Sequence, residues 1–160
     1  MKKAPLLLSI VLTSILFFNA MAQSDSGVKG ELIFSKYASE CLLVMDQAAR
    51  DMSVKGVALV AFIPGDTTTS WTSNMIVVGA LRNSSANYLA IAYSKAAEMA
   101  DLYKDSGSGT REVLHGEFGY QGGIIKKVDS GYILAVFSGA SGEQDVEIAQ
   151  AGLDCLSEQF

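Results

Sequence analysis

Three residues carry side chains that could hold a ligand. His115 is the only histidine of the chain and stands in a glycine-rich stretch, residues 105–123. A neutral imidazole is a common metal ligand, so His115 is a candidate for binding a metal ion. Tyr120 follows in the same stretch, and Lys95 could pair with a carboxylate of a ligand. Each has a simpler interpretation: an exposed loop histidine, a tyrosine that anchors the loop at the sheet edge, and a lysine that reaches solvent.

Familiar catalytic patterns are missing from the sequence. A single histidine allows only one Ser-His arrangement, and no G-x-S-x-G segment marks a nucleophile. The chain has no H-E-x-x-H segment and no cysteine cluster of the kind that binds zinc. Gly116, Gly119 and Gly122 form a spacing that matches neither a Walker loop nor a dinucleotide fingerprint. The sequence therefore names no catalytic residue, and it leaves open whether the protein is an enzyme.

Residues 1–22 have the features of a secretory signal peptide. Lys2 and Lys3 precede an apolar run, which ends in a small-residue cleavage site at Ala20-Met21-Ala22. Cleavage would leave residues 23–160 as one domain, outside the cytoplasm in the periplasm or the extracellular space and not embedded in a membrane. The signal peptide holds two of the 12 Lys and Arg residues and no Asp or Glu, so cleavage changes the net charge from −5 to −7. Such an acidic chain is an unlikely partner for nucleic acid.

The mature chain has two cysteines, Cys41 and Cys155. Because disulfides persist in exported proteins, we expect these two to be joined, although a pair of buried free thiols is the alternative. The bridge would close a loop of about 115 residues and stabilise the fold by roughly 4–5 kcal/mol in the chain-entropy model. Gly152 lies inside the last helical pattern, where a glycine suggests that another backbone, such as the first helix, comes close. That approach would bring Cys155 toward Cys41.

The hydrophobic periodicity predicts three helices and two β-hairpins. The stretch 23–30 is small and polar, and we expect it to be frayed. The predicted helices span residues 32–52, 86–103 and 143–157, and the predicted strands span residues 56–63, 74–81, 124–128 and 132–137. The order α-β-β-α-β-β-α predicts an α+β fold, a single-domain sandwich in which an antiparallel β-sheet is flanked by helices. Asn83-Ser84-Ser85 is expected to cap the second helix.

A capping box is predicted at the start of the last helix. Ser141 and Gln144 have the S-x-x-Q spacing in which each side chain bonds the backbone amide of the other residue. An anion site at the same helix N-terminus is the functional alternative. Glu143 and Asp145 argue against it, because their carboxylates already occupy the positive end of the helix dipole.

Several short segments together resemble a known family. They are Gly122-Gly123, a two-strand hairpin, Ser138-Gly139, Gln144-Asp145, Ala151-Gly152-Leu153 and, in the second helix, Lys95-Ala96 with Ala100. Across residues 40–156 the chain resembles the GlcG/HbpS-like family of haem-binding or haem-degrading domains. Residues 82–85 depart from the family's usual Arg-Met-Asp-Gly segment, and so does the region before Gly122.

The resemblance implies an α/β sandwich, homo-oligomers in several members, and haem as a ligand of some exported members. In that interpretation His115 or Tyr120 would be the axial ligand of haem, and Lys95 would pair with a propionate. The sequence thus predicts an exported protein that binds haem or another small apolar ligand. Two alternatives stay open: a haem-degrading enzyme, which needs an open iron position and an electron source, and a structural or partner-binding module without a ligand.

Overall fold

The seven elements follow the predicted order. The computed structural model describes the backbone of residues 6–160 and the side chains from residue 26 onward. Along the chain they are α1 (Leu6–Asp51), β1 (Gly56–Pro64), β2 (Thr72–Val78), α2 (Tyr88–Leu102), β3 (Gly123–Val128), β4 (Gly131–Ser138) and α3 (Gly142–Ser157). The predicted α+β class is confirmed. The predicted signal peptide, residues 1–22, lies outside the residues whose side chains are described, and it stays a prediction.

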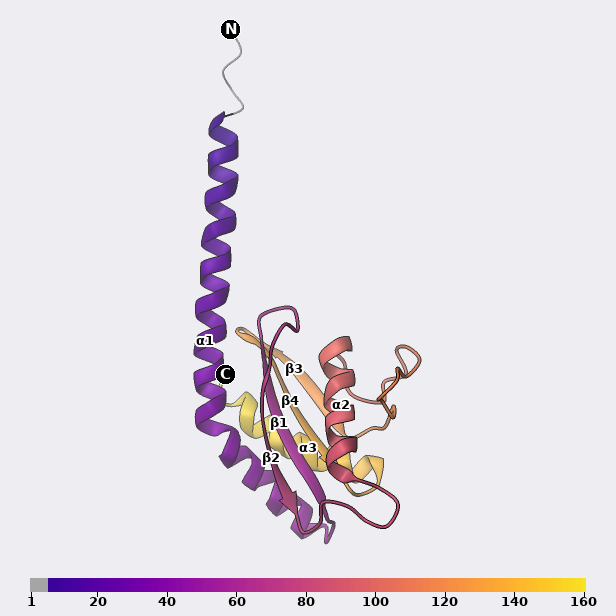
Figure 1. The fold of residues 1–160 in the computed structure, drawn as a ribbon. Helices are drawn as coiled ribbons and strands as arrows, with labels where there is room; N and C mark the ends of the chain where they lie inside the picture. The colour runs from indigo at the N-terminus through magenta and orange to yellow at the C-terminus, as the bar shows by residue number, and fades with distance from the viewer. Residues whose placement is uncertain (1–5) are drawn as a thin grey trace.

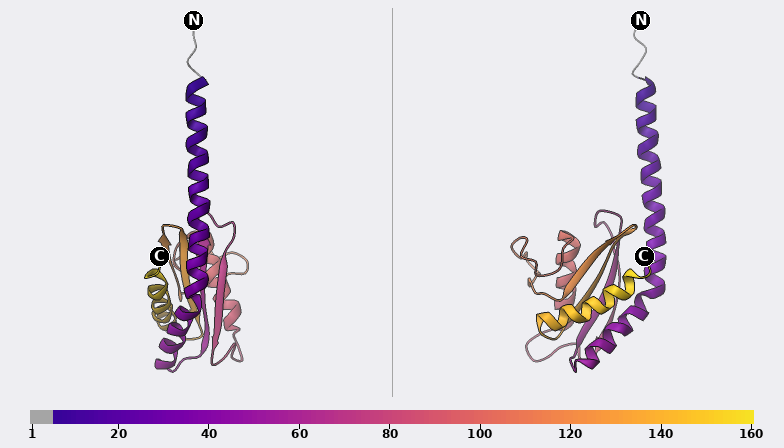
Figure 2. Two further views of the ribbon diagram at one scale, coloured as in Figure 1. Left: turned by 90° about the vertical axis from the view of Figure 1, so that its left-hand side faces the viewer. Right: turned by 180° about the vertical axis from the view of Figure 1, so that it is seen from behind.

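The four strands form one antiparallel sheet in the order β2-β1-β4-β3. Helices α1 and α3 cover one face and α2 covers the other, so the molecule has three layers (Figures 1 and 2). Side chains of the central strand β1 alternate between the two interfaces: Val57 and Leu59 pack toward α2, whereas Ala58 and Val60 pack toward α1 and α3. Both faces are covered, which explains why β1 is almost continuously apolar.

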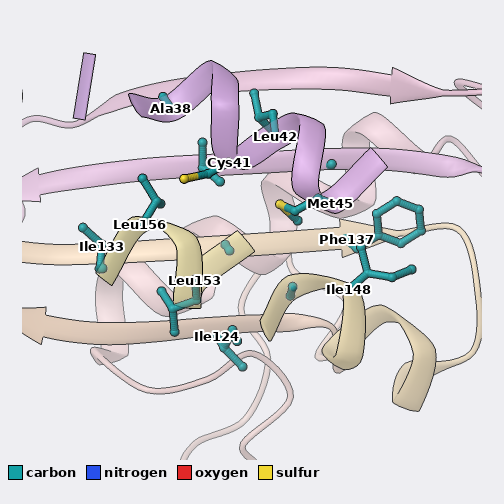
Figure 3. Close-up of a cluster of buried hydrophobic side chains, with 14 of the residues drawn as sticks. Ala38, Cys41, Leu42, Met45, Ile124, Ile133, Phe137, Ile148, Leu153 and Leu156 are labelled. Carbon is teal, nitrogen blue, oxygen red and sulfur yellow. The ribbon is translucent and has the colours of Figure 1, made fainter. Parts of the chain in front are cut away.

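The larger core lies between the sheet and the pair α1 and α3, as Figure 3 shows. The disulfide expected between Cys41 and Cys155 is present there and joins the two helices, with 5.5 Å between the two Cα atoms. Gly152 of α3 lies where an added Cβ would collide with the side chain of Met45. The close approach that was predicted at this glycine is therefore made to α1.

The prediction for the first helix was wrong at its start. Residues 23–30 were expected to be frayed, yet they continue α1. Gly30 is buried where a Cβ would meet Phe62 and Ser130, and Glu31 accepts a hydrogen bond of 2.7 Å from the Thr72 hydroxyl. These contacts to distant strands hold the segment in a helix although its local sequence is small and polar. Within the described part of the chain, no helix is long and apolar enough to cross a membrane.

The connection between β2 and α2 also differs from the prediction. Strand β2 ends at Val78 because Gly79 has a positive φ of 71°, which a strand does not accommodate. Helix α2 begins later than expected and is capped by Asn87, whose side chain accepts from the amide of Ala90. The predicted cap at Asn83 instead organises a turn, in which Asn83 Oδ1 accepts from the amide of Ala86.

Candidate functional site

A buried ion pair joins the two helices that lie on opposite faces of the sheet. The Lys95 ammonium of α2 is 2.7 Å from Oδ2 of Asp145 in α3, and both side chains are almost completely buried. Lys95 Nζ also donates to the carbonyl of Phe137 at 2.8 Å, and Asp145 Oδ1 accepts from the amide of Ala140 at 2.9 Å. The pair therefore lies at the end of β4, where the chain turns into α3.

Gly122 makes room for this pair. Its φ is +118°, and a Cβ at this position would meet Lys95 Nζ, the Asp145 side chain and the Phe137 carbonyl. The backbone of the glycine stays attached to the sheet, because its carbonyl accepts from the amide of Phe137 at 2.9 Å. Glycine is thus needed here for two reasons, the backbone conformation and the space that the ion pair fills.

Burial determines the direction of both pKa shifts. Removal from water lowers the pKa of the Lys95 ammonium, and the negative charge of Asp145 opposes that shift. Removal from water likewise raises the pKa of the Asp145 carboxyl, against the opposing effects of Lys95 and of the amides at Ala140 and Gly139. Both shifts favour the neutral forms, so a proton held between the two groups is moved more easily than in an exposed pair.

A cleft of about 670 Å³ opens above the ion pair. Its lining comes from four segments: the β2–α2 connection, the first turns of α2, both ends of the 105–122 loop, and the turn from β4 into α3. Lys95 and Asp145 contribute to the floor together with Ser138. Ser138 is 2% exposed, and its hydroxyl is the neutral polar group of the floor. Tyr88, Ile91 and Tyr120 supply the larger apolar surfaces.

The predicted capping box forms at the edge of this cleft. Ser141 Oγ accepts from the Gln144 amide at 3.3 Å, and Gln144 Oε1 accepts from the Ser141 amide at 3.4 Å. From the sequence, Asp145 was expected to place a negative charge at the positive end of the helix dipole. Its main contact in the structure is instead with Lys95.

The structure places the three predicted site residues in three different environments. Lys95 does not reach solvent, because it is buried in the ion pair. Tyr120 lines the cleft with 53% of its surface exposed, and its ring stacks on Phe118 with 5.6 Å between the ring centroids. His115 is exposed on the loop and does not line the cleft. Lys95 and Tyr120 are thus brought together, and His115 is not.

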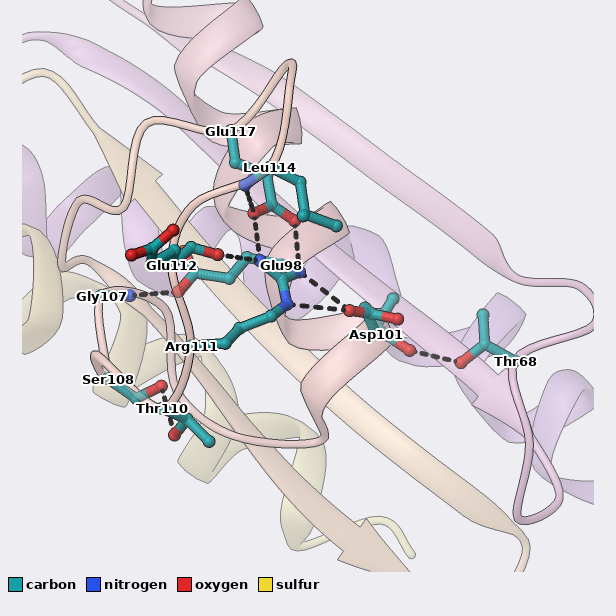
Figure 4. A network of polar contacts seen from close by, with 11 residues as sticks. Thr68, Glu98, Asp101, Gly107, Ser108, Thr110, Arg111, Glu112, Leu114 and Glu117 are labelled. Carbon is teal, nitrogen blue, oxygen red and sulfur yellow. Dashed lines mark hydrogen bonds and ion pairs between the residues drawn. The ribbon is translucent and has the colours of Figure 1, made fainter.

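Ion pairs hold the glycine-rich loop in place. Arg111 contacts Glu117 at 2.7 Å within the loop and Asp101 of α2 at 2.8 Å, and Figure 4 shows its guanidinium between the two carboxylates. Glu117 also accepts from the amide of Leu114, and together these contacts lower the pKa of Glu117 to about 2. Phe118 is tied to α2 through its amide, which donates to Ser94. The loop therefore has a defined position beside the cleft.

One buried carboxylate next to this loop is only partly satisfied. Glu98 Oε1 accepts from the amide of Gly107, whereas its other oxygen is buried without a partner among the described residues. The described residues contain no group of three His, Cys, Asp or Glu side chains close enough to hold a metal ion.

Sequence reasoning missed the pairing of Lys95 with Asp145 and the role of Ser138. Only one local signal existed. Lys95 and Glu98 fall among the small residues of α2 that face the sheet, where charged side chains are rarely found unless they have partners.

The comparisons with known proteins indicate the fold. No family model matches the sequence, and no curated protein matches it. The crystal structure of Klebsiella pneumoniae protein ORFY, described with the family model DUF336, is similar at a TM-score of 0.52 and 18% identity, over 76% of this chain and 88% of that one. The crystal structure of Ybr137w protein is similar at 0.50 and 16%, over 78% and 79% of the two chains. Similarity at this level of identity supports a shared architecture.

Proposed function

We propose that this chain is an exported protein of the GlcG/HbpS-like type, which binds a small molecule in the cleft above Lys95 and Asp145. The DUF336 assignment of ORFY, a GlcG-like family, supports the relationship. Residues that carry the sequence resemblance support it as well, because Lys95 and Asp145 line the cleft and Gly122 lies against both side chains. The apolar N-terminal segment and the disulfide between Cys41 and Cys155 support export.

The observation that carries the proposal is the composition of the cleft. Its volume falls within the range that is typical of small-molecule sites. Its lining is more polar than apolar, because the side chains of Asn83, Gln121 and Glu143 add to the Lys95–Asp145 pair and the Ser138 hydroxyl. A ligand that forms a hydrogen bond with the Ser138 hydroxyl would gain affinity from that bond.

Charge favours neutral or cationic ligands over anions. Lys95 is the one cationic side chain in the lining, whereas Asp145 and Glu143 are both acidic. An anion would face this excess negative charge, and it would also compete with Asp145 for Lys95. We therefore infer that the preferred ligand does not carry a free carboxylate or phosphate.

Haem is a second candidate, because one predicted axial ligand lines the cleft. The Tyr120 phenol could ligate haem iron, and the stacked ring of Phe118 would support it. When bound, haem would supply redox or oxygen-binding chemistry. The residues suit haem less well than a neutral ligand, because the propionates would lie near acidic side chains and His115 lies outside the cleft.

Amide NMR of the purified protein tests small-molecule binding. Neutral, cationic and anionic fragments of matched size would be titrated while the amides of Gly139, Ala140 and Gly142 are followed. We expect neutral fragments to shift these signals saturably and anionic fragments to leave them unchanged. Ala86→Trp, which fills the cleft lining, should abolish the shifts, and Ala90→Trp at an exposed position of the same helix should not. Shifts that survive Ala86→Trp would place binding elsewhere.

A haemin titration separates the remaining alternatives. Saturable change of the Soret band that is lost in Tyr120→Phe and retained in His115→Ala would support haem in the cleft. Bleaching with reductant and oxygen, together with a bilin-like product, would support haem degradation. If neither haemin nor any fragment binds, the remaining interpretation is a structural or partner-binding module without a ligand.

A further inference from the structure

We propose that Lys95 is a nucleophilic amine that captures the carbonyl group of a small neutral aldehyde or ketone as an imine. This inference rests on the proposed binding of a small molecule in the cleft, and it names the chemical class of that molecule.

The Lys95 ammonium group is positioned to meet a ligand at the floor of the cleft. Lys95 Nζ has three hydrogens, of which two are used in the bonds to Asp145 and the Phe137 carbonyl. The third has no partner among the described residues, and Lys95 contributes to the floor of the cleft. A ligand carbonyl that reaches the floor thus meets an amine that is held in place by its other two bonds.

The surroundings of Lys95 favour the free amine that attack requires. Burial lowers the pKa of its ammonium and raises the pKa of the Asp145 carboxyl, so Asp145 can accept the proton across their 2.7 Å contact. Burial is one way in which lysines are activated to form Schiff bases with carbonyl substrates, and the negative charge of Asp145 opposes this activation until its carboxyl takes the proton.

The proposed reaction is balanced without a further reagent. Asp145 takes one proton from the Lys95 ammonium, the nitrogen lone pair attacks the carbonyl carbon, and Asp145 passes that proton to the carbonyl oxygen, which becomes the hydroxyl of a carbinolamine. Asp145 then takes a second proton from nitrogen and gives it to the hydroxyl, which leaves as water while the C=N bond forms. The sum is one amine and one carbonyl compound giving one imine and one water, with no change of oxidation state.

Ser138 is the residue suited to position the carbonyl. Ser138 lines the same floor, so its hydroxyl can donate to the carbonyl oxygen and to the carbinolamine oxygen. The acidic side chains of Asp145 and Glu143 disfavour carbonyl compounds with an anionic group. Together these features select a neutral carbonyl compound.

A purely structural ion pair makes the opposite prediction about reactivity. If the pair only joins α2 to α3, Lys95 is the most shielded lysine and should be the slowest to react. Lys104 and Lys126 are exposed and provide the internal comparison within the same chain. The rank order of labelling among these lysines therefore separates the two interpretations.

Reductive trapping tests the proposal. The purified protein is incubated at pH 7 with limiting propanal and sodium cyanoborohydride, which reduces an imine to a stable propyl-lysine, and the sites are mapped by peptide mass spectrometry. We expect Lys95 to be labelled about tenfold faster than Lys104 or Lys126. Slower labelling of Lys95 than of these exposed lysines would overturn the proposal.

Three variants and one second probe sharpen the result. Ser138→Ala should slow labelling of Lys95 several-fold, Ala86→Trp should block it, and Lys95→Arg should remove it while Lys104 is still labelled. Labelling of Lys95 that is unchanged in Ala86→Trp would contradict capture in the cleft.

Propanamide, which cannot form the imine, is titrated in parallel by NMR. If propanamide shifts the backbone amide signals of the cleft and Lys95 stays unlabelled, the proposal of imine formation is wrong, whereas the proposal of small-molecule binding is supported. If neither occurs, both proposals fail.

Discussion

At the scale of single residues, the site depends on one glycine and two charges that meet inside the protein. Lys95 and Asp145 are 50 positions apart in the sequence and approach each other past Gly122. Buried ion pairs are often no more stabilising than well-packed apolar residues, because both charges must leave water. Removing one partner alone is nevertheless costly, since the other charge stays buried. The prediction for Lys95→Met below uses this asymmetry.

Gly122→Ala should destabilise the fold by about 2–4 kcal/mol. The added Cβ would meet Lys95 Nζ and the Asp145 side chain, and φ of +118° is unfavourable for alanine. Gly116→Ala is the matched control, because its φ is +95° but no atom lies within 4 Å of the added Cβ. Urea denaturation should show the larger loss for Gly122→Ala. Equal losses in the two variants would mean that the crowding around Gly122 is unimportant.

Lys95→Met should lower the free energy of unfolding by about 3–5 kcal/mol at pH 7. It leaves Asp145 buried without its counter-charge, so the folded-state pKa of Asp145 rises further above its unfolded value. A group with a raised folded pKa loses stability as pH increases, so the deficit should shrink as pH falls from 7 toward 4. Urea denaturation across this range measures it, with exposed Lys104→Met as control. A deficit independent of pH would contradict the pairing.

At the scale of elements, the loop of residues 105–122 and helix α2 form one wall of the cleft. The larger apolar side chains of the loop are about half exposed, and ion pairs hold the loop, with Arg111 between Glu117 and Asp101 (Figure 4). Its order should therefore depend on the ionisation of these side chains. Tyr120 and Gln121 of the loop line the cleft, so the order of the loop should also affect binding.

Acid should loosen this loop before it unfolds the domain. The folded pKa of Glu117 is lowered to about 2 from an ordinary value of 4.5, so its contribution is fully present above pH 4.5 and is lost as pH falls toward 2. Hydrogen exchange, corrected for intrinsic rates, should show falling protection of the Leu114 amide, which donates to Glu117. Glu117→Gln should lower that protection already at pH 7. If protection of the Leu114 amide changes neither with acid pH nor in Glu117→Gln, the contacts of Glu117 do not order the loop.

Among the elements, those whose contacts are local could be predicted from the sequence. The cap of α3 was predicted correctly, because Ser141 and Gln144 are three residues apart and their bonds are local. The start of α1 was not predicted correctly, since it depends on the packing of Gly30 against Phe62 of β1 and Ser130 of the β3–β4 turn, both distant in the sequence. The ion pair was missed for the same reason: the meeting of two helices from opposite faces of a sheet leaves no local pattern.

At the scale of the whole molecule, the disulfide holds α1 and α3 on one face of the sheet. The Cys41→Ala/Cys155→Ala variant should be less stable by about 2–5 kcal/mol, because its unfolded chain loses a long closed loop. Thermal denaturation would measure the loss, and non-reducing mass spectrometry of the parent protein should find no free thiol. Two freely alkylated cysteines would refute the bridge. Since neither Cys41 nor Cys155 lines the cleft, fragment binding should survive in the folded variant.

The central claim is that the cleft above Lys95 and Asp145 binds a small neutral molecule. The most direct measurement is a crystal structure of the protein soaked with propanamide, read together with the NMR titration of the same compound. We predict density for the amide in the cleft, with its carbonyl oxygen within hydrogen-bond distance of Lys95 Nζ or Ser138 Oγ. An empty cleft at saturating propanamide, together with unshifted amides at Gly139 and Gly142, would contradict the account.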